Sequence, residues 1–376
     1  MKIPFMKAPV MGREEEYLLE AFRSGYHGGG GFFTGKSQDF LTDLLETKKT
    51  LLTTSATDAL EMSSLLAEIE PGDEVIVPSY TFSSTANAFV LHGGVPVFAD
   101  VDHKTLNMDP TCVEKLVTEK TKVICPIHYA GIPADMDPIN EIAASRGLIV
   151  VEDAAQALGS EYKGRRAGAL CDLGVFSFHA TKSISCGEGG ALTINEERFL
   201  ERSEFLWEKG TDRSLVVSGL KNKYSWVDKG SSFLPSDLLA AILFAQLEQL
   251  ETMQARRRKV FESYFAVVED FLGKGVRCTY IPEGVKSNYH AFWLLFEQDV
   301  RDEFISRCRE RDFIPYIGYV PLHSSKMGSK VGKSPLELPV TDAAGQRLVR
   351  LPFYLMEDDE IERSQYVLRD VLTQIL

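Results

Sequence analysis

Short apolar runs and helix-length amphipathic segments alternate along residues 51–194. The apolar runs cover 51–54, 74–77, 95–101, 123–128, 148–153, 175–178 and 191–194. Helical patterns lie between several of these runs, at 57–69, 85–91, 137–146 and 196–209. Runs rich in β-branched residues that are separated by segments of helical length are typical of βαβ units. The pattern therefore predicts an α/β fold with a mostly parallel sheet covered by helices on both faces.

The second half of the chain has a different pattern. Residues 235–271 are typical of a long charged helix, whole or broken, that leads into a second domain. Strand-like runs follow at 289–296 and 314–319, and a final helical pattern covers 359–376. We therefore expect a large domain over residues 1–250 and a smaller C-terminal α+β domain over residues 251–376.

The composition narrows the ligands that the protein is expected to bind. The chain has 376 residues, of which 44% are hydrophobic, and a formal net charge of -13. This acidic balance argues against nucleic-acid partners and anionic membranes, so a phosphate-bearing ligand needs a local set of donors. The cysteines are scattered without a CxxC pair, and no histidines show HExxH-type spacing, so neither a disulfide framework nor a metal site is expected. No apolar run has transmembrane length and no signal-peptide pattern is present, so we expect a cytoplasmic protein.

Lys182 and Asp153 are the strongest candidates for chemistry. Lys182 follows the run Phe176-Ser177-Phe178 and precedes the glycine-rich segment 187–190, which indicates a closed loop rather than the solvated surface that most lysines occupy. Asp153 ends the apolar run 148–153, and open α/β sheets bind ligands at the carboxyl ends of their strands. A lysine able to form a Schiff base and an acid beside a pyridine nitrogen are the protein groups that pyridoxal phosphate requires.

Other residues fit the same chemistry, although each has a plainer explanation. Ser55 or Thr57 can cap a helix whose free amides attract a phosphate, but ordinary capping is commoner. Phe82 follows the run 74–77 and can stack on a heteroaromatic ring, although a core aromatic is as plausible. Gln156 lies three residues after Asp153 and can donate to the phenolic oxygen of the same ring.

Residues 30–37 match the P-loop expression GxxxxGK[ST], but the context argues against a nucleotide-hydrolysing enzyme. A P-loop follows a buried strand, whereas the polar stretch 17–25 has a helical pattern, and the bulky Phe32 and Phe33 lie within the loop. No GxGxxG opens a helix after a strand, so a dinucleotide-binding domain is also disfavoured.

Taken in order, these segments resemble the fold-type I pyridoxal-phosphate enzymes, and among them the DegT/StrS nucleotide-sugar aminotransferases. The motifs that carry the resemblance over nearly the whole chain are GDEVIVPSYTF, EDAAQ, FSFHATK, Pro321-Leu322-His323 and Arg350-Leu351-Pro352. The segments SYTFSSTANAFVLHGG, IHYAGIPADMD, EKGTDRS and GSSFLPSDLLAA resemble dTDP-4-keto-6-deoxyglucose 4-aminotransferases in particular. The resemblance implies a three-layer αβα large domain with a seven-stranded, mostly parallel sheet.

The resemblance also implies roles for individual residues in binding pyridoxal 5'-phosphate. Lys182 would hold the cofactor as a covalent aldimine and shuttle protons, while Asp153 would keep the pyridine nitrogen protonated. Gln156 would contact the ring hydroxyl, and Phe82 would stack on the ring. The amides of Ala56 and Thr57, together with the hydroxyl of Ser177, would hold the phosphate. His323 matches a histidine near the sugar pocket of relatives.

The implied activity moves an amino group from L-glutamate to C4 of dTDP-4-keto-6-deoxyglucose, with the galacto product favoured, in a homodimer with shared active sites. Relatives carry an asparagine in a GxNYRM segment that reaches the partner's cofactor phosphate; here Ser232 takes its place, so a shorter or water-mediated contact is expected. Arg213 and Lys223 are candidate donors to the substrate diphosphate. The alternatives are C3 amination or another pyridoxal-phosphate reaction on a nucleotide keto sugar, and a non-catalytic sugar-nucleotide sensor.

Overall fold

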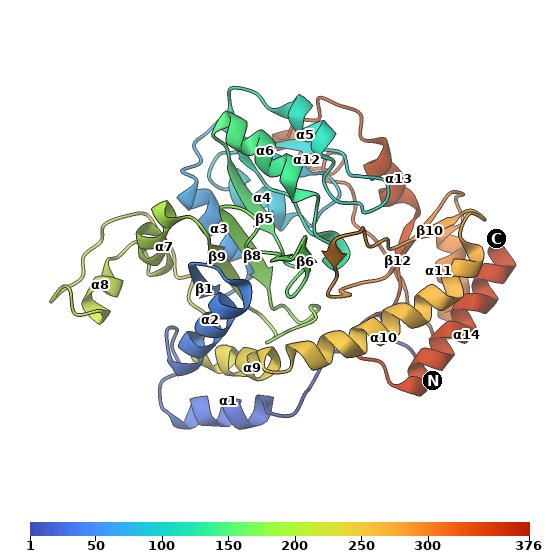
Figure 1. Ribbon diagram of the computed structural model, residues 1–376, viewed down its shortest axis with the longest axis horizontal. Coiled ribbons are helices and arrows are strands. Elements are labelled where there is room, and N and C mark those ends of the chain that lie inside the picture. The colour runs from blue at the N-terminus through green and yellow to red at the C-terminus, as the bar shows by residue number, and fades with distance from the viewer.

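The computed structural model describes residues 1–376 and shows a large α/β part joined to a smaller part by a long helix (Figure 1). The helices are α1 (Glu14–Arg23), α2 (Phe32–Leu45), α3 (Ala56–Leu66), α4 (Ser84–Val90), α5 (Pro110–Leu116), α6 (Met136–Arg146), α7 (Leu200–Trp207), α8 (Arg213–Val217), α9 (Asp237–Leu247), α10 (Leu250–Val268), α11 (Arg301–Glu310), α12 (Gly328–Val331), α13 (Pro339–Arg347) and α14 (Asp358–Ile375). The strands are β1 (Lys49–Thr53), β2 (Glu74–Pro78), β3 (Val95–Ala99), β4 (Thr121–Ile124), β5 (Ile149–Asp153), β6 (Glu161–Tyr162), β7 (Arg165–Arg166), β8 (Leu173–Ser177), β9 (Gly190–Ile194), β10 (Val276–Cys278), β11 (Val285–Lys286), β12 (Trp293–Phe296), β13 (Tyr316–Ile317) and β14 (Leu348–Arg350).

The large part is built on a seven-stranded sheet in the order β1-β9-β8-β5-β4-β2-β3. The pairs β2–β3, β2–β4, β4–β5 and β5–β8 are parallel, and only β9 runs against its neighbours β1 and β8. This confirms the expected mostly parallel sheet. Because β2, β5 and β8 run in the same direction, their carboxyl ends meet at one edge, where open α/β sheets bind their ligands.

Alternate residues of the central strands enter different cores, so helices cover both faces of the sheet. Val75, Val123 and Val151 pack with α3, α4 and α7 in one core. Ile76, Ile124 and Val150 face the other side, where α5 and α6 cover them, while α2 and α9 cover the β1–β9–β8 end of that side. The three layers are those of the fold-type I class that the sequence predicts.

The smaller part contains an antiparallel sheet in the order β10-β12-β14-β13, which packs with α10, α11 and α14. Helix α10 joins the two parts, because Met253 near its start lies in a core of the large part and Val260 lies in the core of the smaller one. Ile3 also lies in this second core and forms a bridge with Phe313. The first residues of the chain therefore pack against its C-terminal part.

Several predicted elements differ in extent from those in the structure. The long helix predicted over 235–271 is broken between α9 and α10, at Glu248 and Gln249. The strand predicted over 289–296 begins only at Trp293, and Tyr289 adopts a left-handed backbone conformation with φ 55°, which a regular strand does not contain. None of the helices combines the length and the apolar character that crossing a bilayer requires.

Candidate active site

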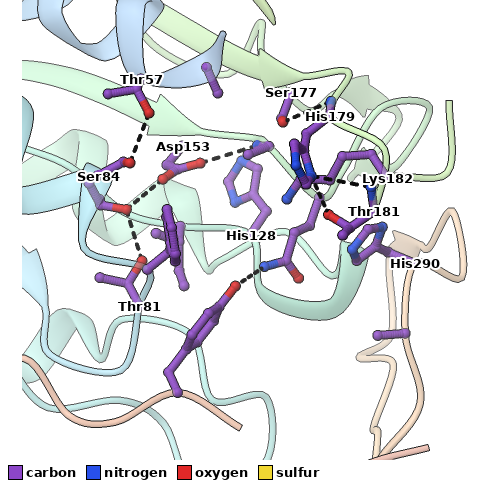
Figure 2. A pocket seen from close by; sticks show the side chains of 18 of the residues that line it. Thr57, Thr81, Ser84, His128, Asp153, Ser177, His179, Thr181, Lys182 and His290 are labelled. Carbon is purple, nitrogen blue, oxygen red and sulfur yellow. Dashed lines mark hydrogen bonds between the residues drawn. The ribbon is translucent and has the colours of Figure 1, made fainter. Parts of the chain in front are cut away.

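A cavity of about 400 Å³ opens where the carboxyl ends of β2, β5 and β8 meet. Phe82 reaches it from the loop after β2, Asp153 from the end of β5 and Ser177 from the end of β8. Lys182 and Thr57 line the same cavity, and Figure 2 shows their side chains turned toward it. The structure therefore brings together residues that are separated by more than a hundred positions in the sequence.

Lys182 lies in the loop between β8 and β9, as the sequence predicts, and its surroundings make its amine a better nucleophile. Its pKa is lowered to about 8, chiefly because the side chain is desolvated. The carboxylate of Asp153 acts in the opposite direction, and the charge of Arg350 lowers the pKa further. A larger share of this amine is neutral near physiological pH than of an ordinary lysine, and the neutral amine is the form that attacks carbonyl groups.

Asp153 is held by hydrogen bonds to both carboxylate oxygens. The hydroxyl of Thr85 donates to Oδ2 at 2.7 Å, and the amide of Ala155 donates to Oδ1 at 3.2 Å. Thr85 lies on α4 and is completely buried, and its hydroxyl also pairs with that of Thr81 at 2.9 Å. No basic side chain of the chain forms a salt bridge with Asp153, so the carboxylate is available to a cationic group of a ligand.

A buried histidine behind Asp153 strengthens the end of β5. Nδ1 of His128 accepts a hydrogen bond from the amide of Ala134, so its Nε2 carries the proton that it donates to Glu152 at 2.8 Å. Glu152 also accepts hydrogen bonds from backbone amides, including that of Gly168 at 2.8 Å. The amide of His128 in turn donates to the carbonyl of Asp153 at 3.1 Å. This network fixes the backbone from which Asp153 projects.

The start of α3 forms a place for a phosphate. Ala56 and Thr57 begin the helix, so their amides have no carbonyl partner four residues earlier within it, and both residues line the cavity. Ser55 caps the helix by accepting a hydrogen bond from Asp58 at 3.1 Å. A Cβ atom at Gly190 would lie 2.5 Å from the amide nitrogen of Ala56, so only glycine permits this close approach of β9.

Gln156 and Phe82 lie on the wall of the cavity together with Tyr319, which comes from the smaller part. The amide of Ala130 donates to Oε1 of Gln156 at 2.8 Å, which turns the side-chain nitrogen toward Tyr319, where it donates to the hydroxyl at 3.0 Å. The rings of Phe82 and Tyr319 have their centroids 6.4 Å apart. Phe82 remains 60% exposed, so its ring is free to cover a flat ligand.

His290 lies beside the lysine loop and contributes no positive charge there. Its Nδ1 lies 3.2 Å from the hydroxyl of Ser183, the residue that follows Lys182. Burial holds the pKa of His290 well below its usual value, and the charges of Lys182 and Arg257 lower it further. The imidazole is therefore neutral and adds no charge beside Lys182.

Four residues predicted for the site, Ser232, Arg213, Lys223 and His323, lie outside this cavity, and Lys223 is exposed. Ser232 is exposed and forms a bridge with Glu208, and Arg213 pairs with the same glutamate at 3.4 Å. His323 contacts the hydroxyl of Ser79 at 2.7 Å and the carboxylate of Asp342 at 3.3 Å. Arg213 begins α8, which projects from the large part (Figure 1), and the bridge with Glu208 places Ser232 next to the end of α7.

The P-loop-like sequence at residues 30–37 forms no phosphate site. Gly31 caps α2, so most of the motif lies in that helix. The carboxylate of Asp237 occupies the helix start, where it accepts hydrogen bonds from the amides of Phe33 at 3.3 Å and Thr34 at 2.7 Å. An anion from the chain itself thus takes the position where a phosphate would bind.

Thr85, Tyr319 and Arg350 also line the cavity, yet the sequence assigned no role to them. Arg350 belongs to one of the motifs of the resemblance, but its neighbours in the sequence give no sign that it faces Lys182. The cavity as a whole fits pyridoxal phosphate: an amine with a lowered pKa, an unpaired carboxylate, amides at a helix start and an exposed aromatic ring match the four parts of that molecule.

Comparisons with known proteins agree with this fit. The sequence profile of the "DegT/DnrJ/EryC1/StrS aminotransferase family" matches residues 12–369. The GDP-perosamine synthase of Caulobacter vibrioides is 34% identical over 284 residues, which are 75% of this chain and 73% of that protein.

Solved structures of aminotransferases share the fold over their whole length. The aminotransferase TlmJ from Streptoalloteichus hindustanus superposes with a TM-score of 0.91 at 30% sequence identity, with 99% of each chain covered. The PLP-form of the putative sugar aminotransferase Spr1654 from Streptococcus pneumoniae has a TM-score of 0.91 at 26% identity, with 100% of each chain covered.

Proposed function

The chain belongs to the DegT/DnrJ/EryC1/StrS aminotransferase family and is a transaminase that depends on pyridoxal phosphate, and from this premise we propose its substrates. It transfers the amino group of L-glutamate to C4 of dTDP-4-keto-6-deoxyglucose and yields a dTDP-4-amino-4,6-dideoxyhexose, with the galacto product favoured. The observation that carries the proposal is the cavity that holds Lys182, with its pKa lowered to about 8, together with the unpaired carboxylate of Asp153.

Lys182 is the residue that moves protons in the proposed reaction. Bound pyridoxal phosphate supplies an electron sink for the carbon atom that loses its proton. Nζ of Lys182 would hold the cofactor in the resting enzyme, and the same amine, once free, would accept the α-proton of the donor. In the second half of the reaction the same Nζ delivers a proton to C4 of the sugar and sets its configuration.

The remaining residues hold the cofactor and keep its ring nitrogen in the charged form that the reaction requires. The carboxylate of Asp153, fixed by Thr85, keeps the ring nitrogen protonated, and this charge stabilises the electron-rich transition state. The amides of Ala56 and Thr57 and the hydroxyl of Ser177 bind the phosphate. Gln156 contacts the ring oxygen, and Phe82 covers the face of the ring.

The choice of C4 and of the dTDP sugar rests on the segments GSSFLPSDLLAA and SYTFSSTANAFVLHGG, which resemble enzymes with that specificity. Amination at C3, or another pyridoxal-phosphate reaction on a nucleotide keto sugar, is the alternative within the family. A sugar-nucleotide sensor without activity is disfavoured because the lysine, the acid and the glutamine are retained together around one cavity. The free thiols, none of which forms a disulfide, support a reducing compartment such as the cytoplasm.

A homodimer is part of the proposal. The projecting segment around α8 exposes large apolar side chains, among them Trp226 at 82%, Val217 at 79% and Leu220 at 75%. An apolar group of this kind on a projecting segment is typical of a surface that a partner covers. Ser232 does not line the cavity of its own chain, and we propose that it contacts the cofactor phosphate of a second copy.

The test of this function is a reaction of the purified protein with L-glutamate and dTDP-4-keto-6-deoxyglucose. We expect 2-oxoglutarate and an amino sugar nucleotide in equal amounts, with the nitrogen on C4 when the product is analysed by NMR. Lys182→Ala should release no 2-oxoglutarate. Amination at C3 would overturn the regiochemistry, and full activity of the Lys182 variant would overturn the catalytic assignment.

A further inference from the structure

Arg257 carries a buried positive charge that no salt bridge neutralises. It lies in the middle of α10, the helix that joins the two parts, and it is 5% exposed. Its guanidinium group donates hydrogen bonds only to backbone carbonyls. Burial lowers its pKa to about 9, so the group still carries its charge at neutral pH. Burying a charge without a counter-ion costs free energy, and groups of this kind cluster at functional sites.

The guanidinium group of Arg257 holds the backbone of the segment 288–290, shortly before β12. Nε donates to the carbonyl of Tyr289 at 3.0 Å, and Nη2 donates to the carbonyl of His290 at 2.5 Å. Tyr289 has φ 55°, a left-handed conformation that residues other than glycine keep only where surrounding contacts hold it. The ring of Phe353, whose centroid lies 4.9 Å from the guanidinium carbon, restricts the orientation of the group.

The segment 288–290 also contacts two loops of the large part that border the cavity. Nδ2 of Asn288 donates to the carbonyl of Gln156 at 2.9 Å. Nδ1 of His290 lies 3.2 Å from the hydroxyl of Ser183, the residue after Lys182. His290 lines the cavity, and Figure 2 shows its ring beside Lys182. The segment therefore connects the loop that carries Gln156 with the loop that carries Lys182.

We infer that Arg257 is a positioning residue of the active site, which acts on Lys182 through the segment 288–290. Its two hydrogen bonds fix the backbone of His290, and the imidazole then holds Ser183 and the lysine loop. Nζ of Lys182 is thereby kept directed into the cavity. The contact is a hydrogen bond and not a charge effect, because burial keeps the pKa of His290 well below its usual value. The inference rests on the proposed role of Lys182 in attaching the cofactor.

The test follows the capture of pyridoxal phosphate by the cofactor-free enzyme, in which Nζ condenses with the aldehyde and releases water. Stopped-flow absorbance measures the rate. Arg257→Met should slow capture about tenfold or more, the effect of losing a hydrogen bond from a charged group. Arg257→Lys keeps the charge without the planar pair of donors, so its rate should be intermediate. Arg258→Met is the matched control and should capture the cofactor at the wild-type rate, because Arg258 follows on the same helix but is exposed and pairs with Glu262.

A double-mutant cycle separates positioning from a general contribution to stability. If Arg257 acts through His290 and Ser183, the combination of Arg257→Met with Ser183→Ala should slow capture no more than the slower single variant. Independent effects would multiply, and that result would overturn the inference. His290→Ala leaves the guanidinium group and its carbonyl acceptors in place and should slow capture as much as Arg257→Met. Should Arg257→Met fail to fold, an unchanged rate in His290→Ala would still refute the inference.

The proposed function and this inference fail in different ways. Borohydride reduction of the captured cofactor, followed by peptide mass spectrometry, identifies the lysine that holds it. Modification of a lysine other than Lys182 would refute the catalytic assignment and the inference together. Capture that is lost in Lys182→Ala but unchanged in Arg257→Met would overturn the inference alone. A lower Tm of Arg257→Met with an unchanged rate of capture would likewise show that the arginine contributes only to stability.

Discussion

Thr85 donates a hydrogen bond of 2.7 Å to Asp153, and this contact joins the start of α4 to the end of β5. Thr85 is completely buried, so packing holds its hydroxyl in place against the carboxylate of Asp153, which lines the cavity. The other oxygen is held by the amide of Ala155 at 3.2 Å. The acid is therefore fixed from two directions before any ligand binds.

Thr85→Val should lower kcat about tenfold or more, because a hydrogen bond to a charged group contributes about 1.5–3 kcal/mol and valine has nearly the same shape. The KM for the nucleotide sugar should change little, since Thr85 acts only through Asp153. Thr81→Val is the control: it removes the partner of Thr85 but leaves the bond to Asp153. Steady-state kinetics of both variants, with the fold checked by circular dichroism, measures the effect. An unchanged kcat in Thr85→Val would show that the carboxylate needs no such support.

The reaction of the cofactor-free enzyme with pyridoxal phosphate should depend on pH in a way that reveals the lowered pKa of Lys182. With a pKa of about 8, the neutral share of the amine grows about tenfold from pH 7 to pH 9 and then levels off. An ordinary lysine would gain about 100-fold over the same interval without levelling. Stopped-flow absorbance of cofactor uptake measures the rate, with free lysine as the reference. Arg350→Gln should move the midpoint to higher pH, because its charge lowers this pKa.

The sheet of the large part could be predicted from the sequence because its strands are buried apolar runs that follow one another along the chain. The seven predicted runs correspond to β1, β2, β3, β4, β5, β8 and β9, with ends that differ by a few residues. The smaller part was harder to predict. β14 has only three residues and gains its partners β12 and β13 from other segments, so its sequence alone carries little signal. The polar helix α11 was likewise missed.

The candidate site likewise contains some residues that could be predicted from the sequence and others that could not. Lys182 and Asp153 belong to sequence motifs whose residue types indicate their chemistry. The structure brings both residues into one cavity. Thr85 and Arg350 take part only because α4 and β14 approach that cavity in the folded chain. Threonine and arginine are common residues, and no spacing in the sequence distinguishes these two from others. Such contacts depend on tertiary packing, which the local pattern does not encode.

Asp237 should stabilise the fold through the start of α2. It is 2% exposed and accepts hydrogen bonds from the amide of Thr34 at 2.7 Å and from its hydroxyl at 2.8 Å. Asp237→Ala should reduce the free energy of unfolding by about 2 kcal/mol, as expected for the loss of a helix cap with charged hydrogen bonds. Urea denaturation of the apoenzyme measures the change. Asp43→Ala, at an exposed position of the same helix, is the control and should stay within about 0.5 kcal/mol of the wild type.

Trp226 should be necessary for the proposed homodimer. Its side chain is 82% exposed on the segment that carries Val217 and Leu220, and a charge placed in an apolar interface is costly. In sedimentation velocity we expect the wild type at twice the 41.9 kDa mass of one chain and Trp226→Asp at the mass of one chain. Ser145→Asp adds the same charge at an exposed polar position of α6, outside this segment, and should remain dimeric.

The same variant also tests whether the subunits share their active sites. If Ser232 contacts the cofactor phosphate of the second copy, the monomeric Trp226→Asp protein should lose pyridoxal phosphate on dialysis several-fold faster than the wild type, because one phosphate contact is missing from each site. The absorbance of the retained cofactor measures this loss. Ser232→Ala provides the comparison, since it removes the contact but keeps the dimer. A monomeric variant that holds the cofactor as firmly as the wild type would show that each chain completes its own site.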